Sequence, residues 1–456
     1  LPILRGRTLA GTIGTNMTQI VPPLDQGRLT RVLGPAQIST DIERGSMNKL
    51  PNPAARVALA TAFLGMLLAR PAFSDDGPPK EPGKTQEAEK EDERPAKVSY
   101  KNNAATFESD RLVIALANRV QFRFTDEFPD DSVRLSGTAA AGDSRAAFRV
   151  RRAKTSLSGW FWRPEFKFDL QLSWAGPEAG ASAQTALEDA LITWDVSKKE
   201  QFQITFGQFK VPLGRQEMTS SSRMQFADRD IFSFEFTRGR DLGLELNGVV
   251  ARDRLSYMVG VFNGNAASRL GNDNSRFQYN ARVMFEPWGH VGYSEGDFES
   301  KDKPLFAVAG QFEQNNQAYT SNVGDNLKTT IWGGDVVFKY KGFSVWAEYL
   351  ARDRKPQPVG STDPSQAPFE TQSFNSNGWH GQAGYFLKRD VLEIAMRYAA
   401  YDPSDRVKDN DRKEVGGALS YFINRHFVKF QADFRQLESS DGTKAKELRI
   451  QSQVMF

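Results

Sequence analysis

The chain has 456 residues, in which 59 Lys and Arg nearly balance 56 Asp and Glu, and a formal net charge of +3 lacks the basic excess of a nucleic-acid-binding protein. It has no cysteine and three histidines, which excludes disulfides and thiolate metal sites, and we expect no metal and no cofactor. Its 33 Phe, 11 Tyr and 8 Trp accompany a polar mean hydropathy of −0.52, a mixture typical of a barrel with an apolar outside and a wet inside.

The N-terminal part of the chain shows three successive compositions. Residues 1–46 have little periodicity, and we expect them to be an upstream extension that is not translated, with translation starting at Met47. Residues 47–74 have a basic start, an apolar run and small residues at the end, which is the pattern of a secretory signal peptide. That run is too short to span a bilayer as a helix, which needs about 20 residues. Residues 75–98 are rich in Pro, Gly, Glu and Lys, and we predict a disordered charged tail.

From about residue 99 to the end, apolar and polar residues alternate. The clearest case is Glu165–Trp174, where the apolar side chains fall on one face and the polar side chains on the other. A period of two residues predicts β-strands, and about 16 segments show it. They cover residues 112–124, 147–161, 165–174, 187–196, 201–209, 240–251, 255–263, 277–286, 305–313, 329–340, 343–350, 377–388, 391–401, 413–423, 427–436 and 447–456.

The connections between these segments alternate between long and short. Long ones such as 210–239 follow every second segment, and short ones such as Lys341-Gly342 join the others. Residues 287–304 are the exception, because they are long where a short turn is expected. Outer-membrane barrels have tight turns on one side and larger loops on the other, whereas a sandwich has no reason to alternate in this way. We therefore predict an all-β fold, a transmembrane antiparallel β-barrel of about 16 strands over residues 99–456.

Two segments carry a resemblance to a known family. They are Phe148–Ser158 (FRVRRAKTSLS), followed by Gly159, and Phe206–Ser222 (FGQFKVPLGRQEMTSSS). On these segments the chain resembles the phosphate-selective porin O/P family of bacterial outer membranes. The resemblance implies a barrel of about 16 strands, assembly as a homotrimer, and passive diffusion with anion or phosphate preference.

Basic residues in a long loop folded into the lumen would line the constriction of such a barrel. The candidate is the third long loop, 210–239, because basic side chains at a narrow constriction attract anions. The resemblance supports Lys210 most directly, since this residue lies in a matched segment. Arg149 and Arg151 should point into the lumen from their strand. The predicted constriction and anion-binding residues are Lys210, Arg215, Arg223, Arg229, Arg149 and Arg151.

The predicted lumen is mixed in sign. The alternation slips after Arg152, which indicates a β-bulge and leaves the directions of Arg152 and Lys154 open. The inward face also carries acidic residues, among them Asp169, Glu348 and Asp433. We therefore expect weak anion preference or general diffusion.

These observations predict a porin of the bacterial outer membrane that allows passive diffusion of small hydrophilic solutes and ions. The alternative is an outer-membrane binding or structural barrel without channel selectivity. An enzyme is disfavoured, because His290, His380 and His426 have no neighbouring nucleophile or ligand spacing, and GxSxG, HExxH and P-loop motifs are absent from the sequence. The expected partners are outer-membrane lipid, small anions such as phosphate and two further copies of the chain, with no nucleic acid.

Overall fold

The computed structural model describes residues 97–101, 103–129, 145–175, 186–267, 271–272, 276–299, 302–319, 325–357 and 373–456. The predictions for residues 1–46 and 47–74, and for the tail as far as residue 96, lie outside the described residues. Among the residues described, no helix is long and apolar enough to cross a membrane.

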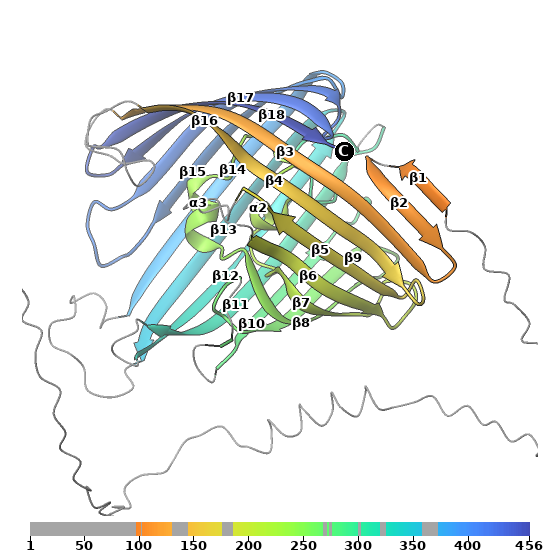
Figure 1. The fold of residues 1–456 in the computed structure, drawn as a ribbon. Helices are drawn as coiled ribbons and strands as arrows, with labels where there is room; N and C mark the ends of the chain where they lie inside the picture. The colour runs from red at the N-terminus through yellow and green to blue at the C-terminus, as the bar shows by residue number, and fades with distance from the viewer. Residues whose placement is uncertain are drawn as a thin grey trace, which may run out of the picture. The chain divides into compact units, whose positions relative to one another are not determined.

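Within these residues 18 strands form one antiparallel sheet. From β3 to β18 each strand pairs with the next along the chain, and β18 pairs back with β3, so this part of the sheet closes into a barrel (Figure 1). The predicted antiparallel barrel of about 16 strands is confirmed. The strands are β1 Lys97–Lys101, β2 Ala104–Ser109, β3 Leu112–Pro129, β4 Arg145–Phe161, β5 Phe166–Ser173, β6 Ala186–Asp195, β7 Gln203–Lys210, β8 Arg240–Val250, β9 Leu255–Phe262, β10 Gln278–Phe285, β11 Leu305–Tyr319, β12 Asp325–Tyr340, β13 Phe343–Gln357, β14 Phe374–Lys388, β15 Leu392–Asp402, β16 Arg412–Asn424, β17 Val428–Ser439 and β18 Lys444–Met455. Two short helices, α2 Arg215–Met218 and α3 Ile231–Phe236, lie between β7 and β8.

A hairpin of β1 and β2 precedes the barrel and was not predicted. β2 pairs with the first residues of β3, as far as Leu116, whereas β18 pairs with β3 from Arg119 onwards. The hairpin therefore continues the sheet where β18 ends. β1 begins at Lys97, so the end of the predicted tail at residues 97–98 is strand, which corrects that boundary. Two strands this short carry too few alternating residues to stand out beside the charged segment before them.

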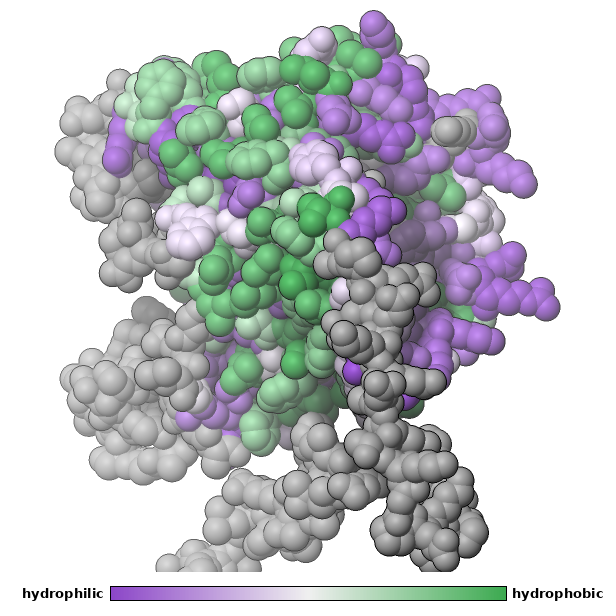
Figure 2. All heavy atoms as spheres, turned by 45° about the vertical axis from the view of Figure 1, so that its right-hand side comes forward, coloured by the Kyte–Doolittle hydropathy of each residue, from purple (hydrophilic) through white to green (hydrophobic). Residues whose placement is uncertain are grey.

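The two faces of the barrel wall have opposite chemistry. On β17, Phe430 and Phe434 are exposed outside, whereas Lys429, Gln431 and Asp433 are buried inside. Figure 2 shows apolar side chains gathered over the outer surface of the wall. An apolar outside over a polar inside is the arrangement of a transmembrane barrel and the reverse of a water-soluble protein.

Tight turns join alternate strand pairs, as the loop lengths predicted. Between β12 and β13, Lys341 and Gly342 have φ of 49° and 89°. Positive φ at both central residues defines the type I′ turn, whose twist matches that of the flanking strands. The connection between β10 and β11 is the long one that breaks the alternation, and it has a separate role inside the barrel.

Candidate functional site

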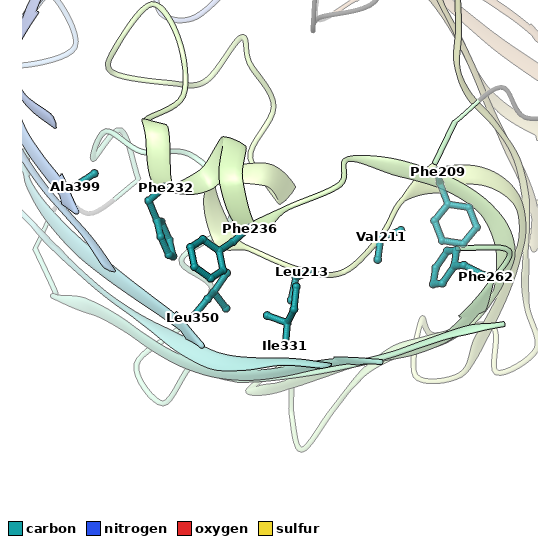
Figure 3. Packing of buried hydrophobic residues seen from close by; sticks show 9 residues of the cluster. All are labelled: Phe209, Val211, Leu213, Phe232, Phe236, Phe262, Ile331, Leu350 and Ala399. Atoms are coloured by element: carbon teal, nitrogen blue, oxygen red, sulfur yellow. The ribbon is translucent and has the colours of Figure 1, made fainter. Parts of the chain in front are cut away.

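The connection of residues 211–239, termed the inner loop, folds into the barrel. An apolar patch on the inner wall receives it, made by Ile331 of β12, Leu350 of β13 and Ala399 of β15 (Figure 3). Removing these side chains from water holds the inner loop against an otherwise polar wall. The inner-loop residues that cover the patch are Val211, Leu213, Phe232 and Phe236.

The inner loop packs closely against the wall at Gly378 of β14. A Cβ on Gly378 would lie 2.8 Å from the ring of Phe232 and 2.5 Å from the Cβ of Tyr401. Side-chain carbons do not approach this closely, so any other residue would push the inner loop away. The glycine therefore makes room for the α3 helix.

Side chains of the barrel wall accept hydrogen bonds from backbone N–H groups of the inner loop. Buried N–H groups without partners are costly, and wall carboxylates and amides accept them here. The donors and acceptors are Gly214 to Gln311 (2.9 Å), Arg215 to Glu348 (2.8 Å), Ala227 to Asp433 (2.7 Å) and Ile231 to Glu414 (3.0 Å).

A second segment, residues 286–299 between β10 and β11, also enters the barrel and is termed the clamp segment. Its Val291 is fully buried against the inner wall. The N–H of Glu295 donates to the carbonyl of Arg223 (3.2 Å), and the Glu295 carboxylate accepts from the N–H of Gln225 (2.7 Å) and the side chain of Gln216 (3.1 Å). The clamp segment thus holds the inner loop, although it lies between two strands that a tight turn was expected to join.

These two segments cover one side of the lumen and leave the other open to water. On the covered side, inward bases of β10, β12, β15 and β17 are at most 2% exposed, namely Arg282, Lys339, Arg397 and Lys429. On the other side, inward residues of β4 to β6 stay partly exposed, namely Ser156, Ser158, Asp169, Gln171 and Asp189. Partly exposed inward side chains therefore lie along β4 to β6, and this is where we expect the path for solutes.

Three of the six predicted basic residues belong to the framework of the inner loop. The Lys210 ammonium donates to the carbonyl groups at the C-terminal end of α2. Arg215 is buried and faces Asp335 at 3.5 Å, and Arg229 is buried and pairs with Glu217 at 3.1 Å. In this arrangement all three position the inner loop.

The other three predicted residues are Arg149, Arg151 and Arg223. Arg149 on β4 and Arg223 on the inner loop are exposed, and no described residue forms an ion pair with either guanidinium. Arg151 binds Asp228 of the inner loop at 3.0 Å and its side chain is 8% exposed. Arg149 and Arg223 are therefore the members of the predicted set that face solvent.

A β-bulge on β4 sets the direction of its basic residues. The register with β3 shifts between Gln121 and Phe122, opposite Arg151. Arg152 and Lys154, whose directions the sequence left open, are both buried inside. The slip in alternation was the signal for this bulge, and the structure confirms it.

A second bulge, on β6, places two adjacent carboxylates inside. The pairing with β5 shifts after Gln171, beside Glu188 and Asp189. Glu188 binds Lys154 at 2.5 Å, and Asp189 binds Arg240 at 2.8 Å. Neither residue was among the predicted site residues, although two neighbouring acids within one strand were a signal of the irregularity.

The inner-loop residue Asp228 is the meeting point of three arginines. Its carboxylate binds Arg123 at 2.7 Å, Arg152 at 2.9 Å and Arg151 at 3.0 Å. Burial alone would raise the pKa of Asp228, but the guanidinium groups hold this pKa well below its usual range. The sequence did not predict this convergence, because the three arginines come from β3 and β4 and lie far from Asp228 in the chain.

Among the described residues, no cluster of three or more His, Asp or Glu side chains could hold a metal ion.

Comparison with known proteins then identifies the barrel. The family described as phosphate-selective porin O and P matches residues 122–456. Porin O of Pseudomonas aeruginosa is 23% identical over 325 residues, which cover 64% of this chain and 68% of Porin O. An uncharacterized protein of Aquifex aeolicus is 20% identical over 284 residues, which cover 56% of this chain and 64% of that protein.

A solved structure shares the fold. The anion-selective porin from Comamonas acidovorans superimposes with a TM-score of 0.50 at 12% identity, covering 75% of this chain and 99% of that one. Sequence and fold agree on the same kind of bacterial outer-membrane barrel. The chain therefore belongs to the phosphate-selective porin O and P family.

Proposed function

We propose that this barrel lets small hydrophilic solutes and ions diffuse passively across the outer membrane, with weak preference for anions. The observation that carries the preference is the pair Arg149 and Arg223, exposed without a carboxylate partner among the described residues. The acid Asp189 on the open side is neutralised by Arg240. Basic groups that face the path raise the local concentration of anions.

The preference is weak because the path also presents negative charge. Asp169 on β5 is partly exposed on the inner face, where it pairs with Ser158 of β4 and Leu191 of β6. The family description and the name Porin O support phosphate among the anions that pass. Outer-membrane lipid around the apolar wall and a homotrimer complete the proposal.

The residues inside the barrel support a channel over an enzyme. His380 contacts the carboxylate of Asp230 at 2.6 Å, and the hydroxyl of Ser233 donates to that same carboxylate. A nucleophilic serine needs the histidine between itself and the acid, and here the acid lies between them. His426 is partly buried and its hydroxyl neighbour Ser294 is 3.3 Å away, and His426 forms no ion pair with an acid among the described residues.

The test is ion selectivity in planar bilayers. In a potassium chloride gradient the wild-type barrel gives a reversal potential of anion-selective sign. The variant carrying both Arg149→Gln and Arg223→Gln should lower the anion-to-cation permeability ratio by about two- to threefold. As a control, Lys199→Gln removes one positive charge at an exposed tight turn away from the path and should change the ratio little.

The competing hypothesis is a binding or structural barrel without channel selectivity. It predicts no stepwise conductance, or a reversal potential near zero in wild type and variant alike. A cation-selective sign in wild type would refute the anion preference while leaving the channel intact.

A further inference from the structure

We propose that Glu245 and Asn247 of β8, with Thr205 of β7, form a binding site for a small cation on the inner wall of the barrel. This inference rests on the proposed function, because it names the residues that let cations pass and so keep the preference for anions weak. Thr205 pairs with Glu245 across the two strands, and Asn247 follows on the same face.

The carboxylate of Glu245 is buried without a basic partner. Glu245 is 7% exposed, and no described residue forms an ion pair with it. Its neighbours on the inner face are all neutral, namely Thr205 on β7, Gly260 on β9, and Gly243 and Asn247 on β8 itself. A buried carboxylate without a counter-charge is costly, so this position favours the arrival of a cation.

Other inward acids have their counter-ion in the wall. Asp433 binds Arg449 at 2.6 Å, and Asp335 binds Arg282 at 2.6 Å. In both pairs the folded chain supplies the positive charge. For Glu245 the described residues supply none, so its counter-ion comes from the solution in the lumen.

Hydrogen bonds hold the oxygen atoms of the site in place. Asn247 Nδ2 donates to Glu245 Oε1 and to Thr205 Oγ1, both at 3.0 Å. Thr205 Oγ1 is also 2.9 Å from Thr193 Oγ1 of β6. Glu245 Oε2 and Asn247 Oδ1 accept no hydrogen bond from a described residue, so both are available to a ligand. Carboxylate and amide oxygens, completed by water, are the ligands that hard cations prefer.

One side of the carboxylate is apolar and the other is wet. A Cβ on Gly243 would lie 2.5 Å from the ring of Phe262, and a Cβ on Gly260 would lie 2.4 Å from it, so this ring covers both glycines beside Glu245. On the other side Asn247 is partly exposed. The apolar flank lowers the local dielectric, which strengthens the attraction between the carboxylate and a cation.

The site suits a passing ion. One carboxylate with neutral oxygens holds a cation loosely, and conduction requires binding that also allows release. β8 is two strands from β6, at the edge of the wall where we expect the path for solutes. A cation that stops at Glu245 therefore contributes a cation current beside the anion current.

The experiment compares Glu245→Gln with Asp195→Asn in planar bilayers. Both substitutions remove one buried carboxylate, but the oxygens of Asp195 already accept from the Ser197 hydroxyl and the N–H of Glu200, each at 2.9 Å. In a potassium chloride gradient, Glu245→Gln should raise the anion-to-cation permeability ratio by about twofold. Asp195→Asn is the matched control and should change the ratio less.

A third variant separates binding from the general effect of charge. Asn247→Ala keeps the net charge but removes a free oxygen and the hydrogen bond that orients the carboxylate. It should raise the ratio in the same direction as Glu245→Gln and by less, whereas an effect of charge alone predicts no change. Heat-modifiable gel mobility checks that each variant folds.

Magnesium ion is the direct probe of the site. Millimolar magnesium chloride should raise the anion-to-cation ratio of wild type in a saturable way, because the bound ion neutralises Glu245. The same addition should leave Glu245→Gln unchanged, and Asp195→Asn should respond as wild type does. A wild type without a saturable response would overturn the site even if no Glu245 variant folds.

Equal ratios in Glu245→Gln and Asp195→Asn would also overturn it, as would an unchanged ratio in Asn247→Ala or a magnesium response that survives Glu245→Gln. Failure of the proposed function gives a different result, because wild type would then lack conductance or anion-selective sign before any variant is compared.

Discussion

At the scale of single residues, several of the charges buried inside this barrel lie in ion pairs. Arg282 binds Asp335 at 2.6 Å with both side chains at most 1% exposed, and Arg397 binds Glu414 with both side chains fully buried. Removing one partner of such a pair leaves an uncompensated charge, at a cost of about 3–5 kcal/mol. The interior therefore tolerates many ionisable groups, and only those facing the path are free to act on solutes.

A substitution of Lys210 tests whether this base holds the inner loop or acts on solutes. Lys210→Met removes the ammonium that the carbonyl groups ending α2 share, and we expect the free energy of unfolding to fall by about 1–3 kcal/mol. Anion selectivity should change less than in the Arg149 and Arg223 variant. Urea unfolding followed by tryptophan fluorescence measures the first quantity, and the reversal potential measures the second.

The contrary result is informative for the family resemblance. If Lys210→Met keeps its stability and loses anion preference, the ammonium contacts the solute rather than the inner loop.

His290 in the clamp segment provides a pH prediction. Its hydrogen bond to Glu286 (3.1 Å) raises the pKa of the imidazole above its ordinary value of 6.5. Since the folded-state pKa is raised, the contact stabilises the segment fully below pH 6.5 and is lost as pH rises through the raised pKa. An NMR titration of His290 should show the raised value, and Glu286→Gln should return it towards 6.5. Identical titrations in both proteins would rule out the pairing.

At the scale of elements, the inner loop is held by three kinds of contact. An apolar patch receives α3, wall side chains accept its backbone N–H groups, and the clamp segment reaches it through Glu295. Together these contacts involve wall strands from β11 to β17, so the inner loop is held across the lumen and not only at its ends on β7 and β8. Because the inner loop is held in one position, the solute path beside it keeps one shape.

A substitution of Gly378 on β14 tests this attachment. Gly378→Ala places a methyl group against Phe232 and Tyr401, and overpacking of this kind costs about 1–3 kcal/mol. We expect lower stability and noisier single-channel current, because the inner loop must shift. Gly417→Ala on β16 is the control, since the nearest atom to its new carbon would be 3.9 Å away. Equal effects of the two substitutions would show that the inner loop does not press on this wall.

At the scale of the whole molecule, the barrel closes between β18 and β3 without help from the hairpin. The closing pairs run from Met455 with Arg119 to Ala445 with Pro129, and β2 contacts β3 only before them. A chain lacking residues 97–109 should therefore keep its heat-modifiable gel mobility and its conductance. Loss of the folded band would show instead that the hairpin is needed to start the closure.

The face of the strand on which each side chain lies and the barrel class could be predicted from the sequence, because both follow from the alternation of neighbouring residues. Alternation in segments such as Glu165–Trp174 has a period that only a strand produces, and a lipid-facing wall requires the apolar side to be continuous. Even the bulge near Arg152 left a trace, because a slip in alternation is a local event. The same rules placed Arg149 inside.

The tertiary structure decided which charges meet. Asp228 and Arg123 are separated by 105 positions, and Glu295 and Gln216 by 79, so no local pattern links them. The helices α2 and α3 are too short for a helical period, and the patch that holds them comes from three separate strands. The sequence by itself determined the barrel and its wet, charged interior through periodicity. Packing of the inner loop across the lumen determined which side stays open, because burial and charge pairing depend on contacts between distant segments.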